Sequence, residues 1–156
     1  MSEDISAIKE NVGRGAALAL VVLPAGVLVW LLLWKAGFIA SIVAFGIVWA
    51  AVMLYRFGSG GALGRTGAFI VLAIVIVTLL LSFLSGMVFD AATELGKIND
   101  LSTWEAFRHP QFWSTFWDVF PDVLPDYKTD FAIAAGFGAL GAFSSLRAVF
   151  QQTAAK

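Results

Sequence analysis

A glycine-rich segment at residues 59–66 has the composition of a phosphate-binding loop. It reads Ser-Gly-Gly-Ala-Leu-Gly-Arg-Thr, and small residues before a helix leave backbone amides free to bind an anion. A true nucleotide loop has a glycine in place of Ser59, a lysine in place of Arg65, and a β-strand before it. We therefore predict a flexible loop and no nucleotide binding. The alternative is that Arg56, Arg65 and the amides of the next helix hold an anionic lipid headgroup.

Side chains that bind metals or move protons are few in this sequence. His109 is the single histidine, with Glu105 one turn before it and Asp118 beyond it. Metal sites usually bring three or four ligands together. We therefore expect His109 to cap the helix that follows Pro110, and we predict no metal site.

Three carboxylates recur at every fourth residue near the end of the chain, at Asp122, Asp126 and Asp130. Pro121 and Pro125 interrupt any helix that would align them on one face. The pattern predicts a solvated, extended linker. Weak calcium binding is the alternative, because hard cations favour carboxylate oxygens.

Several classes of chemistry lack their usual residues. The chain has no cysteine and a formal net charge of −1, so thiolate chemistry is excluded and no basic surface predicts nucleic acid as a partner. A Gly-x-Ser-x-Gly elbow, a His-Glu-x-x-His pair and a dinucleotide glycine fingerprint are all missing. The sequence predicts a non-enzymatic protein without a cofactor.

The elements that position these residues are apolar helices. Of the 156 residues, 60% are hydrophobic and 13% are charged, whereas soluble domains are about half apolar and a quarter charged. The apolar residues form four runs near bilayer length, which predicts one all-α, polytopic integral membrane domain over residues 1–156. After an N-terminal segment at residues 1–15, the four transmembrane helices are expected at 16–34, 38–55, 68–89 and 131–150.

The first two spans are expected to form a tight helical hairpin. An unbroken helix over both would be about 60 Å long, twice the hydrocarbon thickness, so the chain must reverse at residues 35–37. Trp30, Trp34 and Lys35 fit an interfacial position there. Pro24 predicts a bend within the first span, near Leu20.

The basic residues indicate how the chain is oriented. Four spans place both termini and the glycine-rich loop on one side, with six basic and three acidic residues, whereas the other side has four basic and eight acidic ones. Basic residues near span ends stay in the cytoplasm. We therefore predict cytoplasmic termini, an extracytoplasmic loop at residues 90–130, and a location in the plasma (inner) membrane.

The predicted outer loop contains an aromatic amphipathic helix. Ser102 and Glu105 form a capping-box pattern that starts a helix at Thr103, and residues 111–120 place five aromatic side chains on one face. This pattern is typical of a helix at the membrane interface. The face contacts lipid, the protein's own spans or a partner protein, and the residues concerned are Trp104, Phe107, Phe112, Trp113, Phe116, Trp117 and Phe120.

Small residues recur at every fourth position of the last span, at Ala134, Gly138 and Ala142. Such a surface lets helices approach closely. It serves packing within the chain or a contact with a partner or a second copy.

Hydroxyl residues follow one face of the third span, at Thr78, Ser82 and Ser85. They line a pore in an oligomer, with Asp90 and Glu94 at its outer mouth, or they bond to their own helix or a neighbouring one.

Together these patterns predict an accessory or assembly subunit of a larger membrane complex. Its partners are the lipid bilayer and a second protein or further copies of itself. A homo-oligomeric channel or small-solute transporter component is the first alternative. An anionic-lipid-binding protein that uses Arg56 and Arg65 is the second.

Overall fold

A computed structural model describes residues 9–35 and 41–154 of the chain, and within these ranges every element is helical, as predicted, without a strand. The predicted reversal at residues 35–37 lies largely outside the described residues. The elements are α1 (Val12–Ala19), α2 (Val22–Lys35), α3 (Ser41–Ser59), α4 (Arg65–Asn99), α5 (Thr103–Arg108), α6 (Phe112–Val123), the 3-10 helix η1 (Leu124–Tyr127) and α7 (Lys128–Ala154).

Three helical stretches of the described chain are long and apolar enough to cross a membrane. They are Val12–Lys35, Ile42–Ser59 and Arg65–Asn99, and they agree with the first three predicted spans. Residues 131–150, the predicted fourth span, lie within the 27-residue helix α7. This helix is not among the three, so a fourth crossing remains a prediction.

The first span bends where the sequence predicts it. α1 ends at Ala19 and α2 begins at Val22, just before Pro24. Pro24 has no amide to donate to the carbonyl of Leu20, and this carbonyl accepts the Leu23 amide at 3.1 Å instead. The proline therefore separates one span into two helices.

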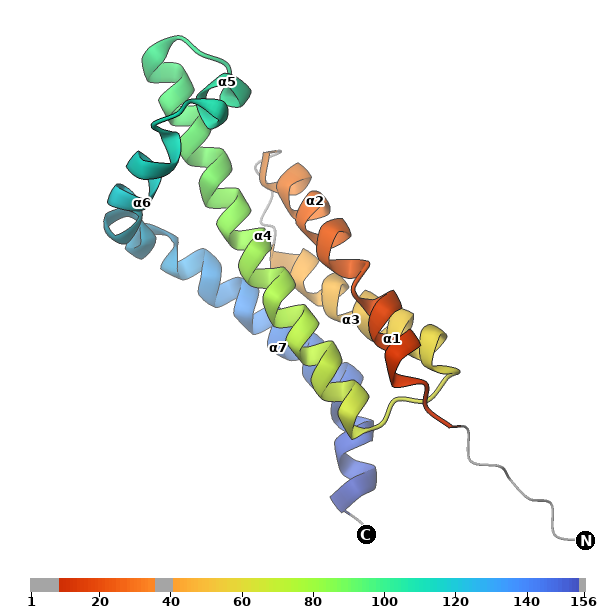
Figure 1. Ribbon diagram of the computed structural model, residues 1–156. Coiled ribbons are helices and arrows are strands. Elements are labelled where there is room, and N and C mark those ends of the chain that lie inside the picture. Colours follow the sequence, from red (N-terminus) through yellow and green to blue (C-terminus); the bar gives the residue numbers. More distant parts are fainter. Residues whose placement is uncertain (1–8, 36–40, 155–156) are drawn as a thin grey trace, which may run out of the picture.

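The helices form an elongated bundle, shown in Figure 1. The Asn11 amide at the start of α1 donates to the Ser59 carbonyl at the end of α3, at 3.1 Å, so these two helices are antiparallel. The start of α1, the turn between α3 and α4 and the end of α7 all lie at one end of the bundle, while α5 and α6 lie at the other (Figure 1). The sequence predicts the same grouping of the termini with the glycine-rich loop.

α4 is the longest element and continues beyond its apolar run. Its 35 residues make it about 52 Å long, against a hydrocarbon thickness of about 30 Å. The predicted third span ends at residue 89, but the helix continues to Asn99, where Asp100 adopts a left-handed conformation with φ 55°. Within the added turns the Thr93 hydroxyl donates to the Phe89 carbonyl, one turn before it, at 2.8 Å. The first ten residues of the predicted loop are therefore helical.

The small residues of α7 pack inside the chain. Ala134 is buried in a cluster with Trp30 and Phe83, and a Cβ atom added to Gly138 would lie 3.0 Å from Leu79 of α4. Ala142 packs against the cluster that joins α1, α3 and α4. This burial favours the intramolecular alternative for the small-residue surface.

The prediction of an extended linker around Asp122, Asp126 and Asp130 is wrong. Pro121 lies inside α6, and Pro125 lies in the first turn of η1, a position that needs no amide donor. α7 begins directly afterwards at Lys128. The chain around the two prolines is therefore helical, because α6, η1 and α7 follow one another with no extended segment between them.

Candidate functional site

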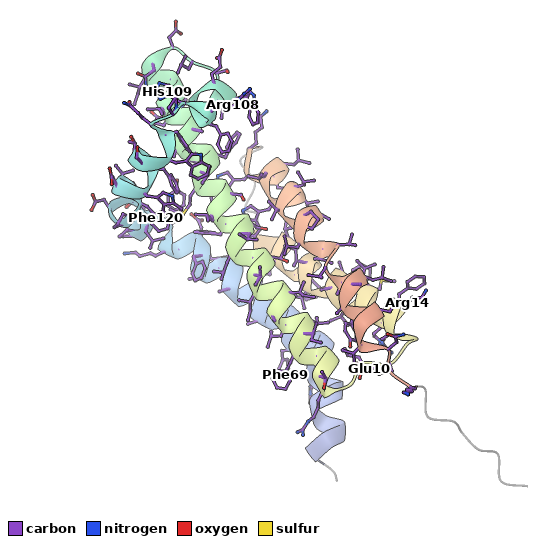
Figure 2. All side chains as sticks on the ribbon, in the orientation of Figure 1. Glu10, Arg14, Phe69, Arg108, His109 and Phe120 are labelled. Carbon is purple, nitrogen blue, oxygen red and sulfur yellow. The ribbon has the colours of Figure 1, made fainter. Side chains whose placement is uncertain are left out.

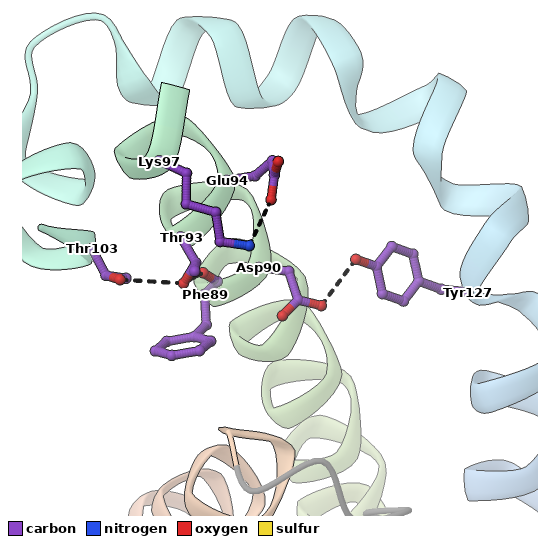
Figure 3. A network of polar contacts seen from close by, with 7 residues as sticks. All are labelled: Phe89, Asp90, Thr93, Glu94, Lys97, Thr103 and Tyr127. Atoms are coloured by element: carbon purple, nitrogen blue, oxygen red, sulfur yellow. Dashed lines mark hydrogen bonds and ion pairs between the residues drawn. The ribbon is translucent and has the colours of Figure 1, made fainter. Parts of the chain in front are cut away.

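The Asp90 carboxylate joins three elements at the far end of the bundle. It is the first charged residue after the apolar run of α4. The indole N–H of Trp34, in α2, lies 3.0 Å from each of its two oxygens. The hydroxyl of Tyr127, in η1, donates to Oδ2 at 3.0 Å, as Figure 3 shows. One carboxylate thus fixes the end of α2 and the end of η1, directly before α7, to α4.

Aromatic rings surround these hydrogen bonds. The Trp34 ring stacks on Tyr127 with centroids 6.1 Å apart, and Phe83 meets both rings edge-on. Gly86 allows Trp34 to lie against α4, because a Cβ atom there would be 2.9 Å from the indole Cδ2. The side chains around Asp90 are therefore held by packing as well as by hydrogen bonds.

Tyr127 is a neutral donor at physiological pH. Burial, the charge of Asp90 and its hydrogen bond raise the pKa of Tyr127 to about 12, and the charges of Asp126 and Asp130 add to the effect. Each of these influences disfavours a phenolate. The hydroxyl therefore keeps its proton and its bond to Asp90.

A pocket of about 440 Å³ opens beside Asp90, between α4 and α6. Asp90 and Glu94 lie on one wall, while Phe112, Phe116 and Val119 lie on the other. Glu94 pairs with the exposed Lys97 at 3.1 Å, whereas Asp90 has no cationic partner among the described residues. The predicted pore-mouth carboxylates therefore line a pocket within one chain.

The segment α5–α6 (residues 103–123) begins at the predicted capping box. The Glu105 amide donates to the Ser102 hydroxyl at 3.2 Å, and the Ser102 amide donates to the Glu105 carboxylate at 2.9 Å. The hydrogen bonds from Ser102 lower the pKa of Glu105. The sequence signal for the start of this helix at Thr103 is confirmed.

The aromatic residues of this segment do not act as one face. Phe112 and Phe116 are buried against α4 and cluster with Ala92, and Phe107 and Phe120 pack partly against the same cluster. The tryptophans are more exposed, with Trp104, Trp113 and Trp117 at 63%, 43% and 51%, and each also lines the edge of a pocket beside α4. The phenylalanines thus hold the segment on α4 and leave three indoles on the surface.

His109 does not take the capping role that the sequence predicts, because the N-cap residue of α6 is Gln111 and this helix has no side-chain cap hydrogen bond. The His109 Nδ1 accepts the Gln111 amide at 3.4 Å, just before α6 begins. Figure 2 shows His109 beside Arg108 at the far end of the molecule. Across the described ranges no group of three or more His, Asp or Glu side chains is placed to hold a metal ion.

The hydroxyl residues of α4 are turned into the bundle. Thr78 and Ser82 are fully buried, and Thr78 donates to the Ile74 carbonyl of its own helix at 2.7 Å. Ser85 is half-buried and lines an apolar pocket with Trp104 and Phe107. Within one chain these residues do not line a common open path.

Glu10 occupies the helix start at which the sequence suggests a lipid headgroup. Its carboxylate accepts the Gly64 amide at 3.0 Å and the Tyr55 hydroxyl at 2.8 Å. Figure 2 shows Glu10 at this end of the bundle. Arg56 donates to the Gly61 carbonyl at 3.3 Å, and Arg65 is exposed. The Gly64 amide at the start of α4 is therefore already bonded to Glu10. Of the groups in the headgroup hypothesis, Arg56 and Arg65 are the ones that still support it.

Sequence reasoning missed the partners of two carboxylates. It placed Trp34 at the membrane interface and gave no role to Tyr127 or Glu10. Their contacts join positions 56, 37 and 54 residues apart, and no local pattern marks such pairs.

Comparison with known protein families, curated proteins and solved structures finds no match to this chain.

Proposed function

We propose that this protein is a non-enzymatic accessory or assembly subunit of a larger membrane complex, and that the segment α5–α6 contacts its partner. The observation that carries this proposal is the exposure of Trp104, Trp113 and Trp117 on a segment held by buried phenylalanines. Tryptophan is enriched among the residues that dominate binding energy at protein interfaces. Burial of a large apolar side chain contributes about 1.5–3 kcal/mol, so three indoles offer a substantial contact.

The preorganised geometry of this segment supports the same proposal. Phe107 contacts both Trp104 and Trp113 through ring pairs with centroids 5.6 and 5.4 Å apart, and Phe116 contacts Trp117 at 5.1 Å. Side chains already fixed by neighbours lose less conformational entropy on binding. A partner therefore meets a surface that needs little rearrangement.

We further propose that the segment α5–α6 lies outside the plasma membrane and that both termini are cytoplasmic. The shared end of the bundle for α1, the turn before α4 and the end of α7 supports this topology (Figure 1). Basic residues at that end, such as Arg14, Arg56 and Arg65, follow the positive-inside rule.

Site-specific photo-crosslinking tests the partner contact. A photoreactive residue replaces Trp113 or Trp117 in the full chain, and the matched control replaces Leu28 or Leu32, which are 62% and 69% exposed on the first span. We expect one protein adduct of fixed mass from the tryptophan positions and none from the leucine positions. Equal yields from both sets would contradict the proposal.

The mass of the particle extracted in mild detergent separates this proposal from the channel. A complex with other chains in a fixed ratio agrees with an accessory subunit. A particle that contains copies of this chain alone, and that passes solutes in liposomes, would contradict it in favour of the channel. Retention of anionic lipid that is lost with Arg56→Gln and Arg65→Gln would favour the headgroup alternative.

A further inference from the structure

Two pockets follow one stripe of α4, on the side that α6 and η1 cover. The pocket beside Asp90 has a volume of about 440 Å³, and a second pocket of about 590 Å³ lies closer to the middle of the helix, at Leu80, Phe83 and Leu84. Met87 and Tyr127 line both pockets, so the two adjoin there. Residues spaced by three and four positions share one helix face, and the stripe from Leu80 to Ile98 has this spacing.

The two pockets differ in chemistry. The pocket beside Asp90, called the upper pocket below, contains Asp90 and Glu94. The second pocket, called the lower pocket, is lined by apolar and aromatic side chains with Lys128 at its edge. Lys128 is the single cation among the residues that line either pocket. An acidic pocket thus adjoins an apolar pocket that has a cation at its edge.

The hydrogen bonds that Asp90 accepts in its pocket come from neutral donors. Trp34 and Tyr127 satisfy part of its hydrogen-bonding capacity, but both donors are neutral, and no ion pair forms at Asp90 within the part of the chain described. A carboxylate has about four acceptor positions. An ammonium N–H can therefore add a charge-assisted hydrogen bond, which is stronger than a neutral one.

The position of the two pockets along the membrane-spanning part of α4 suits a lipid more than a soluble amine. Asp90 directly follows the apolar run at residues 68–89, so it lies where hydrocarbon gives way to the headgroup region. The lower pocket is flanked by residues of that apolar run. A molecule that fills both has a polar head beside Asp90 and an apolar chain beside Leu84.

We propose that the groove between α4 and α6 binds a zwitterionic phospholipid with a primary amine, of the phosphatidylethanolamine class. Its ammonium group lies against Asp90 and Glu94, its phosphate lies toward Lys128, and one acyl chain lies along Leu80 and Leu84. Charge complementarity at both ends of the headgroup identifies this lipid. A choline headgroup has no N–H to donate to Asp90, and a glycerol headgroup has no positive charge.

Lipid exchange on the full chain, purified in mild detergent, tests this site. Phosphatidylethanolamine, phosphatidylcholine and phosphatidylglycerol of identical acyl chains are added, and native mass spectrometry measures the bound fraction of each. We expect preferential retention of phosphatidylethanolamine. Asp90→Asn keeps the size of the side chain and removes the charge, and it should weaken that retention about tenfold, the effect of one charge-assisted hydrogen bond.

Matched variants separate a lost site from a lost fold. Asp118→Asn removes an exposed carboxylate of α6 that lines neither pocket, and it should leave lipid retention unchanged. Thr115→Trp fills the upper pocket without touching the bonds of Asp90, whereas Ser114→Trp adds the same ring at the neighbouring exposed position. We expect Thr115→Trp to abolish the preference and Ser114→Trp to keep it.

Other results would overturn the proposal. They are equal retention of the three lipids by the unaltered chain, or an unchanged preference in both Asp90→Asn and Thr115→Trp. An equal loss of all three lipids in Asp90→Asn would also overturn it, because the headgroup would then play no part. Trp117 lines the second pocket, but Trp104 and Trp113 line neither of the two pockets, so crosslinking from Trp113 tests the proposed partner contact separately from the lipid site.

Discussion

The indole N–H of Trp34 lies 3.0 Å from both oxygens of Asp90, across 56 residues of sequence. This bond joins the last turn of the first span to the point at which α4 leaves its apolar run. Tyr127, whose ring stacks on Trp34, donates to the same carboxylate. Asp90 thus holds three separate parts of the chain at one level of the bundle.

Replacement of Trp34 by Phe should destabilise the protein through this bond. Phenylalanine keeps most of the ring packing on Gly86 and Tyr127 but removes the donor, so a partly buried carboxylate loses a partner. Hydrogen bonds to charged groups contribute about 1.5–3 kcal/mol, and we expect the free energy of unfolding to fall by about this amount. Denaturant titration in mild detergent measures it. Trp49→Phe, at a 57% exposed indole of α3, is the matched control and should change little; equal losses in the two variants would contradict the role of the bond.

Tyr127 should titrate at an unusually alkaline pH. Its pKa is raised from 10.0 to about 12, first by burial and then by Asp90. Because the folded pKa exceeds the unfolded one, the hydroxyl's contribution to stability is complete below pH 10 and is lost as the pH rises through about 12. The difference in tyrosinate absorbance between the unaltered chain and Tyr127→Phe isolates this group, and Asp90→Asn should move its pKa back toward 10.0. Ionisation of Tyr127 at its ordinary pH in the unaltered chain would show that the bond to Asp90 does not form.

Local patterns explain why much of the fold could be predicted. The capping box at Ser102, the break before Pro24 and the apolar runs that give three candidate spans depend on neighbours within a few residues. The continuation of α4 to Asn99 was missed because the sequence argument ended the element where hydrophobicity ended. Half of residues 90–99 are good helix formers, namely Ala91, Ala92, Glu94, Leu95 and Lys97, so polarity there marks a change of environment and not the end of the helix.

The candidate site was only partly predictable. Asp90 and Glu94 were identified as carboxylates at the end of a span, but their pocket needs α6 to fold back along α4. The aromatic pattern of residues 111–120 gave the helix and its apolar residues without showing that Phe112 and Phe116 would be buried while Trp113 and Trp117 would remain exposed. Helical spacing places all of these on one side, and tertiary packing then divides that side between α4 and the surface.

Replacement by alanine should have opposite effects at two glycines. Gly86 lies where α2 approaches α4 closely, whereas Gly136 lies at an open position of α7. Gly86→Ala would place a methyl group 2.9 Å from the Trp34 ring, and overpacking of this kind costs about 1–3 kcal/mol. Gly136 has nothing within 4 Å of an added Cβ atom, so Gly136→Ala meets no obstacle and gains the higher helix propensity of alanine. Thermal unfolding should therefore occur at a lower temperature in Gly86→Ala and at the same or a higher temperature in Gly136→Ala. A neutral Gly86→Ala would mean that Trp34 does not pack against α4.

Glu10 should control the stability of the turn between α3 and α4. Its carboxylate accepts the Gly64 amide at 3.0 Å and the Tyr55 hydroxyl at 2.8 Å. Gly64 caps α4 without a side-chain hydrogen bond of its own, so Glu10 supplies both the acceptor and the negative charge that the start of a helix favours. Gly67 makes room for it, because a Cβ atom there would collide with the Glu10 carboxylate and the Tyr55 ring.

Glu10→Ala removes both bonds and leaves the Gly64 amide without its acceptor. We expect the free energy of unfolding to fall by about 1.5–3 kcal/mol, and amide hydrogen exchange to accelerate at residues 60–68 while residues 103–108 at the other end of the bundle stay unchanged. Glu10→Gln is the matched variant, since it keeps an acceptor oxygen and loses only the charge, and its effect should be intermediate. If exchange at residues 60–68 were the same in all three proteins, the turn would be held by its backbone bonds alone, such as Gly61 to Arg56 at 2.7 Å. The start of α4 would then be open to an external anion, as the arginine hypothesis requires.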